Sequence, residues 1–137
     1  MRDCLDLAVR YNPGSNPAAM LRRLPVPLDA EAAALPGAER KRLALVLLLL
    51  NPKRVLLLDE PFRSLDVESA FMLRQLILQL GCEGRTLLVA ADSLALLDGI
   101  CDDLYVLGGG QVQGRYEHYE FQRAIREAGS AAGFPKK

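Results

Sequence analysis

The chain has 137 residues, the length of one ordinary domain, and this is enough to bury a hydrophobic core. Hydrophobic residues make up 50% of it and charged residues 25%, a balance that excludes an intrinsically disordered chain. The 17 basic residues equal the 17 acidic ones, so no net charge draws the chain to nucleic acid or to acidic lipid.

The cysteines and the apolar runs predict a cytoplasmic protein. Cys4, Cys82 and Cys101 are far apart and form no C-x-x-C pair, which is typical of reduced thiols in the cytosol. The start MRDCLDLAVRYNP lacks the apolar core of a signal peptide. The run LALVLLLL is much shorter than the about 20 apolar residues of a membrane helix. We expect no direct membrane insertion, although the chain could bind peripherally at the inner face of a membrane through a partner.

The first fifty residues predict helices without strands. Asn16 can cap a helix that Pro17 opens, and Asp29 can start another short helix, DAEAAAL. The predicted helices cover residues 2–10, 18–24, 29–35 and about 35–50, the last one ending near Asn51-Pro52. On this last helix, Arg40, Lys41 and Arg42 are expected to form a solvated face.

Short apolar runs alternate with helical patterns after residue 52. VLLLD (55–59) and TLLVA (86–90) are short and uniformly apolar, as buried strands of parallel sheets are. Two further predicted strands are LYVL (104–107) and a short one within GGGQVQGRY, and the predicted helices cover residues 66–80, 93–100 and 117–128. Asp66 is expected to cap the first of these helices and Gly81 to end it, and the tail GSAAGFPKK is expected to fray. This order predicts an α/β fold with a mostly parallel sheet, preceded by a helical subdomain.

Two adjacent carboxylates follow the first predicted strand. Asp59 and Glu60 come at its carboxyl end, where open α/β sheets bind their ligands. Neighbouring residues of a strand point to opposite sides, so the two carboxylates can do different jobs. One can hold Mg²⁺ through water while the other orients or deprotonates an attacking water.

The residues around this pair carry a resemblance to a known family. LPGAE (35–39) opens a helix, and Asp59 lies 24 residues after Leu35. Arg42 and Asn51-Pro52-Lys53 lie between them, and DEPFRSLD (59–66) continues the pattern. About residues 1–115 therefore resemble ABC-type ATPases, in which a signature loop Leu-Ser-Gly-Gly-Gln precedes a Walker B motif and D-loop, Asp-Glu-Pro-x-x-x-Leu-Asp. The part covered corresponds to the family's helical subdomain and the second half of its P-loop NTPase-like core.

The resemblance implies ATP and Mg²⁺ as cofactors and a role for each matching residue. Glu60 would be the catalytic base and Asp59 the Mg²⁺ partner. The positions matched to nucleotide contacts are Pro36, Gly37, Ala38, Glu39, Asp66 and Asp92. It also implies three parts: a helical subdomain (1–52), a partial ATPase core with Walker B, D-loop and switch strand (53–116), and a C-terminal helix and tail (117–137).

Several of these positions depart from the family pattern. Pro36 stands for Ser, which removes a hydroxyl and a backbone N–H. Ala38 stands for Gly and Glu39 for Gln, and Asp92 stands where the family has a switch histidine. The 137 residues contain no Walker A sequence of the Gly-Lys-Ser/Thr type. As alternatives, the LPGAE helix simply packs on the sheet, and Asp92 simply caps the helix 93–100.

Two hypotheses of function follow. The first is a truncated, degenerate ABC transporter ATP-binding domain, inactive as an ATPase alone, that acts with a complete ABC ATPase subunit supplying the Walker A loop, or as a dimer. The second is a non-enzymatic module whose helical part (2–50) binds a membrane permease or regulator. Under either one, the three predicted parallel strands collapse into one small sheet or a partner adds strands to them.

Overall fold

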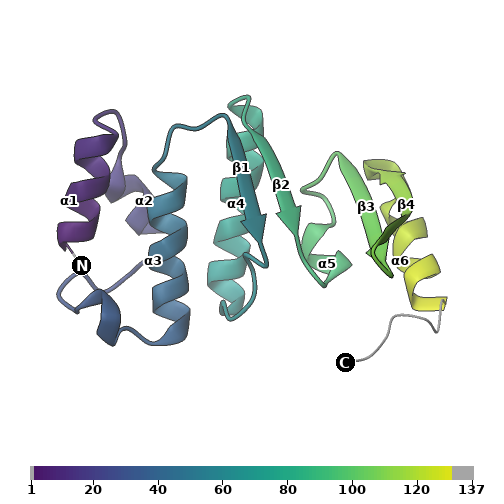
Figure 1. Ribbon diagram of the computed structural model, residues 1–137, viewed down its shortest axis with the longest axis horizontal. Helices are drawn as coiled ribbons and strands as arrows, with labels where there is room; N and C mark the ends of the chain where they lie inside the picture. Colours follow the sequence, from purple (N-terminus) through teal and green to yellow (C-terminus); the bar gives the residue numbers. More distant parts are fainter. Residues whose placement is uncertain (1, 131–137) are drawn as a thin grey trace. The chain divides into compact units, whose positions relative to one another are not determined.

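The computed structural model describes residues 2–130, which divide into two compact units at Ala90–Ala91 (Figure 1). The first unit contains α1 (Arg2–Tyr11), α2 (Pro17–Arg23), a 3₁₀ turn η1 (Ala32–Ala34), α3 (Gly37–Leu49), β1 (Val55–Asp59), α4 (Val67–Cys82) and β2 (Thr86–Ala90). The second contains α5 (Leu94–Leu97), β3 (Asp103–Gly108), β4 (Gln111–Glu117), η2 (His118–Glu120) and α6 (Phe121–Ser130). The expected subdomain boundaries after residues 52 and 116 remain predictions.

The helical first half folds as predicted, with one exception. The Asn16 side chain accepts a hydrogen bond from the Ala19 N–H at 3.0 Å, and Pro17 opens α2. The helix expected to start at Asp29 does not form. The Asp29 carboxylate instead accepts from the Arg2 guanidinium at 2.8 Å, and only the short turn η1 follows. Both α1 and α2 pack on α3, and Arg23 donates to Gln79 to link α2 with α4.

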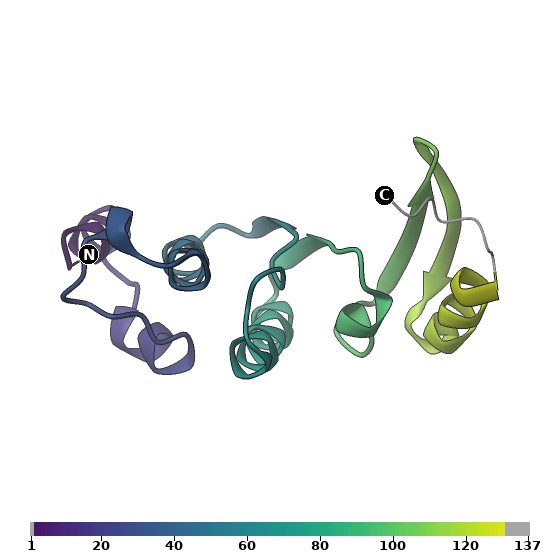
Figure 2. The ribbon, with the colours of Figure 1, turned by 90° about the horizontal axis from the view of Figure 1, so that it is seen from below.

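Strands β1 and β2 pair in parallel, and α4 covers one face of this pair (Figure 2). Leu56 and Leu58 of β1 are buried, as are Leu73 and Ile77 of α4. The alternation of side chains along a strand explains which residues of β1 are buried, because residues two apart share a face. The parallel pairing of VLLLD with TLLVA confirms the predicted strands.

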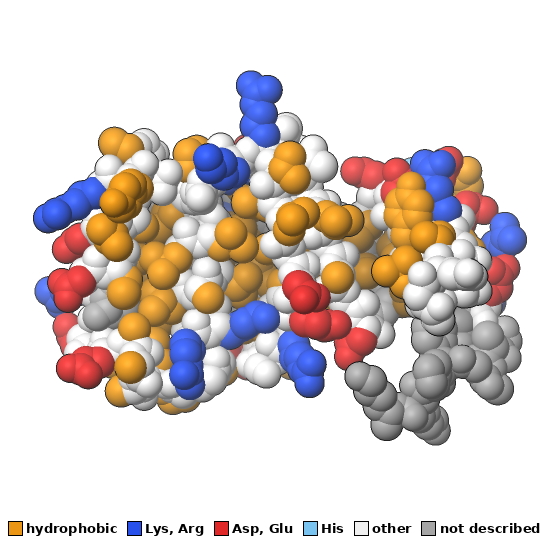
Figure 3. All heavy atoms as spheres, in the orientation of Figure 1, with side chains coloured by type: hydrophobic (Ala, Val, Ile, Leu, Met, Phe, Trp, Pro, Cys, Tyr) orange, Lys and Arg blue, Asp and Glu red, His pale blue; other side chains and the backbone are white. Residues whose placement is uncertain are grey.

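The opposite face of this sheet is bare within the first unit. Its side chains include Val55, Leu57 and Leu88, whose exposed fractions are 58%, 68% and 65%, and Leu57 lies opposite Leu88 in the strand register. Figure 3 looks onto this face and shows hydrophobic side chains over it. The prediction that both strands are buried on two sides is therefore wrong for the described residues. The uniformly apolar sequence of a strand shows that both of its faces can be buried. Whether they are buried depends on another element of the fold packing on each face.

The end of α4 also differs from expectation. The helix continues through Gly81 to Cys82 and stops at Gly84, whose φ of +81° lies in the left-handed region. The Gly84 N–H donates to the Gly81 carbonyl at 2.9 Å, and the Arg85 N–H donates to the Leu80 carbonyl at 3.0 Å. This pair of bonds is a Schellman motif, in which glycine takes the left-handed position. Two glycines near the helix end made the choice ambiguous from sequence.

The second unit is an antiparallel hairpin with helices. β3 pairs with β4, and within residues 2–130 β1–β2 and β3–β4 form separate sheets. The first alternative, one small parallel sheet of three strands, is therefore wrong, and the addition of strands by a partner stays a prediction. The helix expected over 93–100 is limited to Leu94–Leu97, since Asp98 leaves the helical region and Gly99 has a φ of +72°. The C-terminal helix begins as η2, where Glu117 and Glu120 form a capping box, and continues as α6. Phe121 and Ala124 of α6 are buried.

Three smaller expectations concern the cysteines, membrane helices and the C-terminal tail. Among the described residues, Cys4, Cys82 and Cys101 form no disulfide. Within the described part of the chain, no helix is both long and apolar enough to cross a membrane. The predicted fraying of the tail concerns residues that lie mostly outside the described range.

Candidate functional site

The acidic turn, residues 59–66, connects β1 to α4. Pro61 and Phe62 are buried and anchor it beneath the sheet end. The Arg63 N–H donates to the Glu60 carbonyl and the Leu65 N–H to the Phe62 carbonyl, both at 3.2 Å. Two successive tight turns therefore reverse the chain between the strand and the helix, and they hold the acidic residues at the carboxyl end of β1.

Glu60 has an unusual backbone conformation in this turn. Its φ is +46°, in the left-handed region that residues other than glycine rarely adopt. The Glu60 N–H donates to the Ala90 carbonyl at 2.9 Å, which extends the β1–β2 ladder by one bond. The change of backbone conformation directly after Asp59 turns Glu60 out of the strand alternation.

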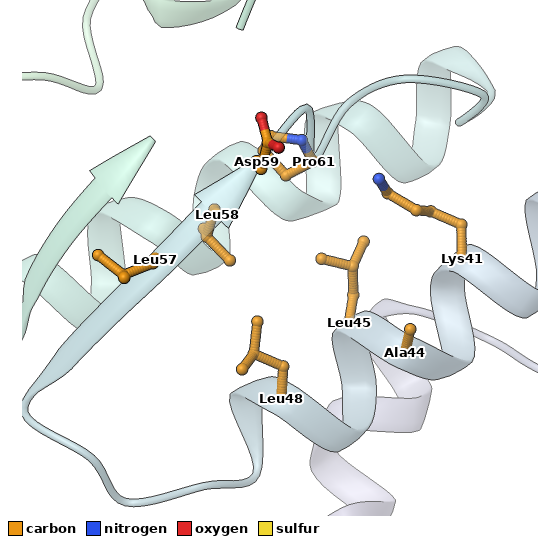
Figure 4. Close-up of a pocket in the computed structure, with 8 residues that line it drawn as sticks. All are labelled: Lys41, Ala44, Leu45, Leu48, Leu57, Leu58, Asp59 and Pro61. Carbon is orange, nitrogen blue, oxygen red and sulfur yellow. The ribbon is translucent and has the colours of Figure 1, made fainter. Parts of the chain in front are cut away.

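Asp59 ends β1 and is exposed. It lines a groove of about 180 Å³ between β1 and α3, together with Lys41, Ala44, Leu45, Leu48, Leu57, Leu58 and Pro61 (Figure 4). The groove is apolar along most of its length and carries its charges, those of Asp59 and Lys41, at one end (Figure 4).

Asp66 is occupied by contacts within the first unit. Its carboxylate accepts from the Ser69 N–H at 2.7 Å, from the Ser69 hydroxyl at 3.0 Å and from the Arg42 guanidinium at 3.2 Å. The two bonds from Ser69, followed by the charge of Arg42, lower the pKa of Asp66 below its ordinary value. Asp66 is thus the N-cap of α4, as predicted, and it also joins α4 to α3.

The LPGAE segment, residues 35–39, forms the start of α3. Leu35 is buried, Pro36 occupies the N-cap position, and Gly37 is exposed with open space around it. Ala38 and Glu39 are half-buried in the first turn. The first N–H groups of a helix have no partner inside the helix. Pro36 has no N–H, so in α3 these groups begin at Gly37.

Asp92 belongs to the second unit, and the expectation that it caps the following helix is wrong. Ser93 occupies the N-cap position of α5, and Asp92 is exposed one residue before it. The other predicted site residues, 36–39, 59, 60 and 66, all lie in the first unit.

Two contacts join α3 to the acidic turn, and sequence reasoning missed both. The Lys41 ammonium donates to the Glu60 carbonyl at 2.8 Å, and Arg42 reaches Asp66 with only 18% of its side chain exposed. The prediction of a solvated Arg40–Arg42 face is therefore wrong for Lys41 and Arg42, while Arg40 is exposed. A basic triplet on a helix gives no signal of which residue turns inward when the facing element is unknown.

No protein-family model matches the chain. Individual proteins do. Over 90 residues, or 66% of the chain, it is 36% identical to a "Putative ABC transporter ATP-binding protein" of Treponema denticola. Over 87 residues, or 64%, it is 33% identical to the "Xylose import ATP-binding protein XylG" of Pseudomonas fluorescens. The matches cover 18% and 17% of these relatives.

Solved structures share the fold. The "Structure of ATP binding subunit of ABC transporter" superposes with a TM-score of 0.77 over 93% of the chain and 57% of that structure, at 20% identity. A dimeric ATP-binding cassette bound to ADP and Pi superposes with a TM-score of 0.65 over 73% of the chain and 44% of that structure, at 19% identity. The chain contains part of an ABC-type ATPase domain.

This partial ABC-type ATPase domain spans about a fifth of the length of the curated relatives it matches. The predicted α/β fold of the P-loop NTPase type is confirmed by its structural neighbours. The resemblance stated from LPGAE and DEPFRSLD is likewise confirmed.

Proposed function

We propose that this chain provides the acidic half of an ABC-type nucleotide site and acts together with a complete ABC ATPase subunit that supplies the phosphate-binding loop. The observation that carries the proposal is the pair Asp59 and Glu60 at the carboxyl end of β1, in a turn bonded to α3. The relatives are named as ATP-binding proteins of transporters, which supports the choice of nucleotide as ligand.

Asp59 and Glu60 fit Mg²⁺ only as part of a larger site. In the described part of the chain, no group of three or more His, Cys, Asp or Glu side chains could hold a metal ion. Mg²⁺ is usually bound by one or two carboxylates together with substrate phosphates and water, so the pair suffices where a nucleotide is present. Asp59 would hold the ion through water, and Glu60 would accept the proton of the attacking water.

The remaining contacts to nucleotide would come from the start of α3. Its first N–H groups and the open space at Gly37 favour an anion there, whereas Pro36 removes one donor and Glu39 adds negative charge. Asp66 already accepts three hydrogen bonds. Asp92 matches the family's switch histidine by resemblance, and an ionised carboxylate cannot donate to a phosphate as an imidazole can. These features support the proposal that the isolated chain neither binds nucleotide measurably nor hydrolyses it.

Calorimetry of Mg²⁺·ATP with the purified chain, alone and mixed with a full-length sugar-import ATP-binding protein, tests the proposal. We expect no binding by the chain alone and tighter binding by the mixture than by the full-length protein alone. ATP turnover of the mixture should fall with Glu60→Gln, because the amide cannot accept a proton. The matched control is Glu68→Gln, an exposed carboxylate in the first turn of α4. Turnover that ignores both the added chain and Glu60→Gln would refute the proposal.

A second candidate is a non-enzymatic module that binds a permease or regulator through the helical part of the first unit. The observation in its favour is the exposure of Leu7 and Tyr11 on α1. Under this alternative, removing the charges of Asp59 and Glu60 leaves function intact. Substitutions on the surface of α1 and of residues 12–34 then abolish it, and the reverse result supports the first proposal.

A further inference from the structure

Lys41 contacts the backbone of the acidic turn. Its ammonium group donates to the Glu60 carbonyl at 2.8 Å, in a partly buried position. Figure 4 shows the side chain leaving α3 toward the end of β1, where Asp59 and Pro61 lie. A charged donor makes a stronger hydrogen bond than a neutral one, particularly where water is partly excluded.

The backbone of Glu60 requires such support. A φ of +46° is unfavourable for a residue with a Cβ and persists only where the surroundings impose it. Three bonds surround this residue: its N–H donates to Ala90, and its carbonyl accepts from the Arg63 N–H and from Lys41. Two of them come from the strand ladder and the turn itself, and the third comes from a side chain of α3.

We infer that Lys41 is a positioning residue for Glu60. By holding the carbonyl, it keeps Glu60 in the left-handed conformation, and this conformation sets the direction in which the Glu60 carboxylate leaves the strand end. Lys41 lies two residues after Glu39, so the position of the LPGAE helix is coupled to the direction of the Glu60 side chain. The relevance for catalysis rests on the proposed function, whereas the coupling itself does not.

A purely structural role for Lys41 gives different expectations. Its aliphatic stem lines the groove beside Leu45, and this packing would survive the loss of the ammonium group. Lys41→Met keeps a stem and removes the donor, and Lys41→Arg keeps a charged donor. Arg40→Met removes a charge from an exposed position one residue away and is the matched control.

Backbone NMR of the isotopically labelled full chain tests the inference. We expect Lys41→Met to shift the Glu60 carbonyl carbon, to move its Cα and Cβ shifts away from left-handed values, and to speed exchange of the Glu60 amide by roughly tenfold or more. Lys41→Arg should restore these signals, and Arg40→Met should leave them unchanged. Unchanged exchange of the Leu73 amide verifies that the core is intact.

Two results would overturn the inference. One is a Lys41→Met chain whose Glu60 signals match those of the unsubstituted chain. The other, which requires no variant, is the absence in the unsubstituted chain of a through-hydrogen-bond correlation between Lys41 Nζ and the Glu60 carbonyl carbon. A failure of the proposed function can be told apart from a failure of this inference. The proposed function is tested by ATP turnover with Glu60→Gln, whereas the inference is tested by the response of the Glu60 NMR signals to Lys41→Met.

Discussion

Asp66 uses its carboxylate as the N-cap of α4 and as the acceptor for Arg42. Each of these contacts favours the ionised form, which is why the pKa of Asp66 is lowered from its ordinary value of 3.8. A carboxyl group whose pKa is lower in the folded than in the unfolded chain stabilises the fold above the unfolded pKa. This contribution is lost as pH falls through the folded pKa.

Asp66→Asn separates the cap from the charge. Asn remains a good N-cap, so the Ser69 N–H keeps an acceptor, but the attraction to Arg42 is removed. We expect the variant to unfold at lower urea concentration than the unsubstituted chain at neutral pH. As pH falls below 3.8 the difference should shrink, because Asp66 is protonated first in the unfolded chain and then, at the lower folded pKa, in the folded chain as well. Urea midpoints measured across this pH range check the expectation, and a difference that stays constant down to the lowest pH would contradict it.

At the scale of elements, the two glycines near the end of α4 have opposite roles. Gly84 has a φ of +81°, where any other residue is strained. Gly81 lies inside the helix, and an added Cβ there would meet nothing within 4 Å. The end of α4 therefore depends on one glycine and tolerates the loss of the other.

The pair Gly84→Ala and Gly81→Ala tests this difference. Gly84→Ala should destabilise the chain by about 1–2 kcal/mol, the cost of a left-handed conformation for alanine. Gly81→Ala should stabilise it by up to about 1 kcal/mol, because alanine favours a helix interior over glycine. Urea unfolding of both variants provides the measurement, with each serving as the control for the other. Equal effects of the two substitutions would refute the assignment of the helix end.

The bare face of the β1–β2 sheet is a second feature at this scale. Leu57 and Leu88 are register partners on neighbouring strands, so they lie side by side on the same face of the sheet, and both are largely exposed. An apolar sheet face with unpaired strand edges promotes association between copies of a chain. We therefore expect self-association to depend on these two side chains.

The double substitution Leu57→Thr and Leu88→Thr should lower self-association in sedimentation velocity while changing the free energy of unfolding by no more than about 0.5 kcal/mol per site. The control is Leu58→Ala on the covered face, where Leu58 is buried. It should cost about 2–5 kcal/mol, since truncation of a buried leucine leaves a cavity. Self-association that persists in the double variant would show that another surface is responsible.

At the scale of the whole molecule, the division into two compact units is the main feature. Residues up to Ala90 and residues from Ala91 onward each contain their own sheet and their own buried leucines. Proteins open locally in cooperative units, and such units commonly coincide with supersecondary motifs. Each unit is therefore expected to have its own opening equilibrium.

Amide exchange by mass spectrometry tests this independence in the full chain. Leu104→Ala removes a buried side chain from β3, and such truncations cost at least about 2 kcal/mol. Exchange should become faster in β3 and β4 and remain unchanged in β1 and β2. The reciprocal variant, Leu73→Ala in α4, should affect the first unit alone. Faster exchange across both units in either variant would indicate a single cooperative fold.

Much of this fold is predictable because its signals are local. Pro17 after Asn16, Asp66 three residues before Ser69, and the apolar runs at 55–59 and 86–90 each predict a feature that the structure contains. The errors concern what covers or neighbours an element. Leucine runs in β1 and β2 do not reveal whether both faces are covered, and LYVL does not reveal which strand it pairs with.

The same contrast between local sequence signals and tertiary contacts applies to the candidate site. Asp59 and Glu60 are recognisable because a strand ends at them, whereas the left-handed φ of Glu60 has no sequence signal, since that position favours glycine or asparagine. The contact of Lys41 with Glu60 joins residues far apart in the chain and depends on how α3 packs beside β1. Local patterns identify the groups, and tertiary packing determines how they are held.

The two kinds of strand pairing also set an order of events during folding. β3 and β4 are joined by a turn at Gly109-Gly110, where both φ angles are positive, so this hairpin can close within about 1–10 μs once its own residues are free. β1 and β2 are separated in the chain by the whole of α4, so their pairing closes a longer loop than the β3–β4 hairpin does and costs more entropy. During synthesis on a ribosome, the strand VLLLD therefore waits without a partner until residue 90 has emerged. That interval is when this segment is most vulnerable to association with the wrong chain.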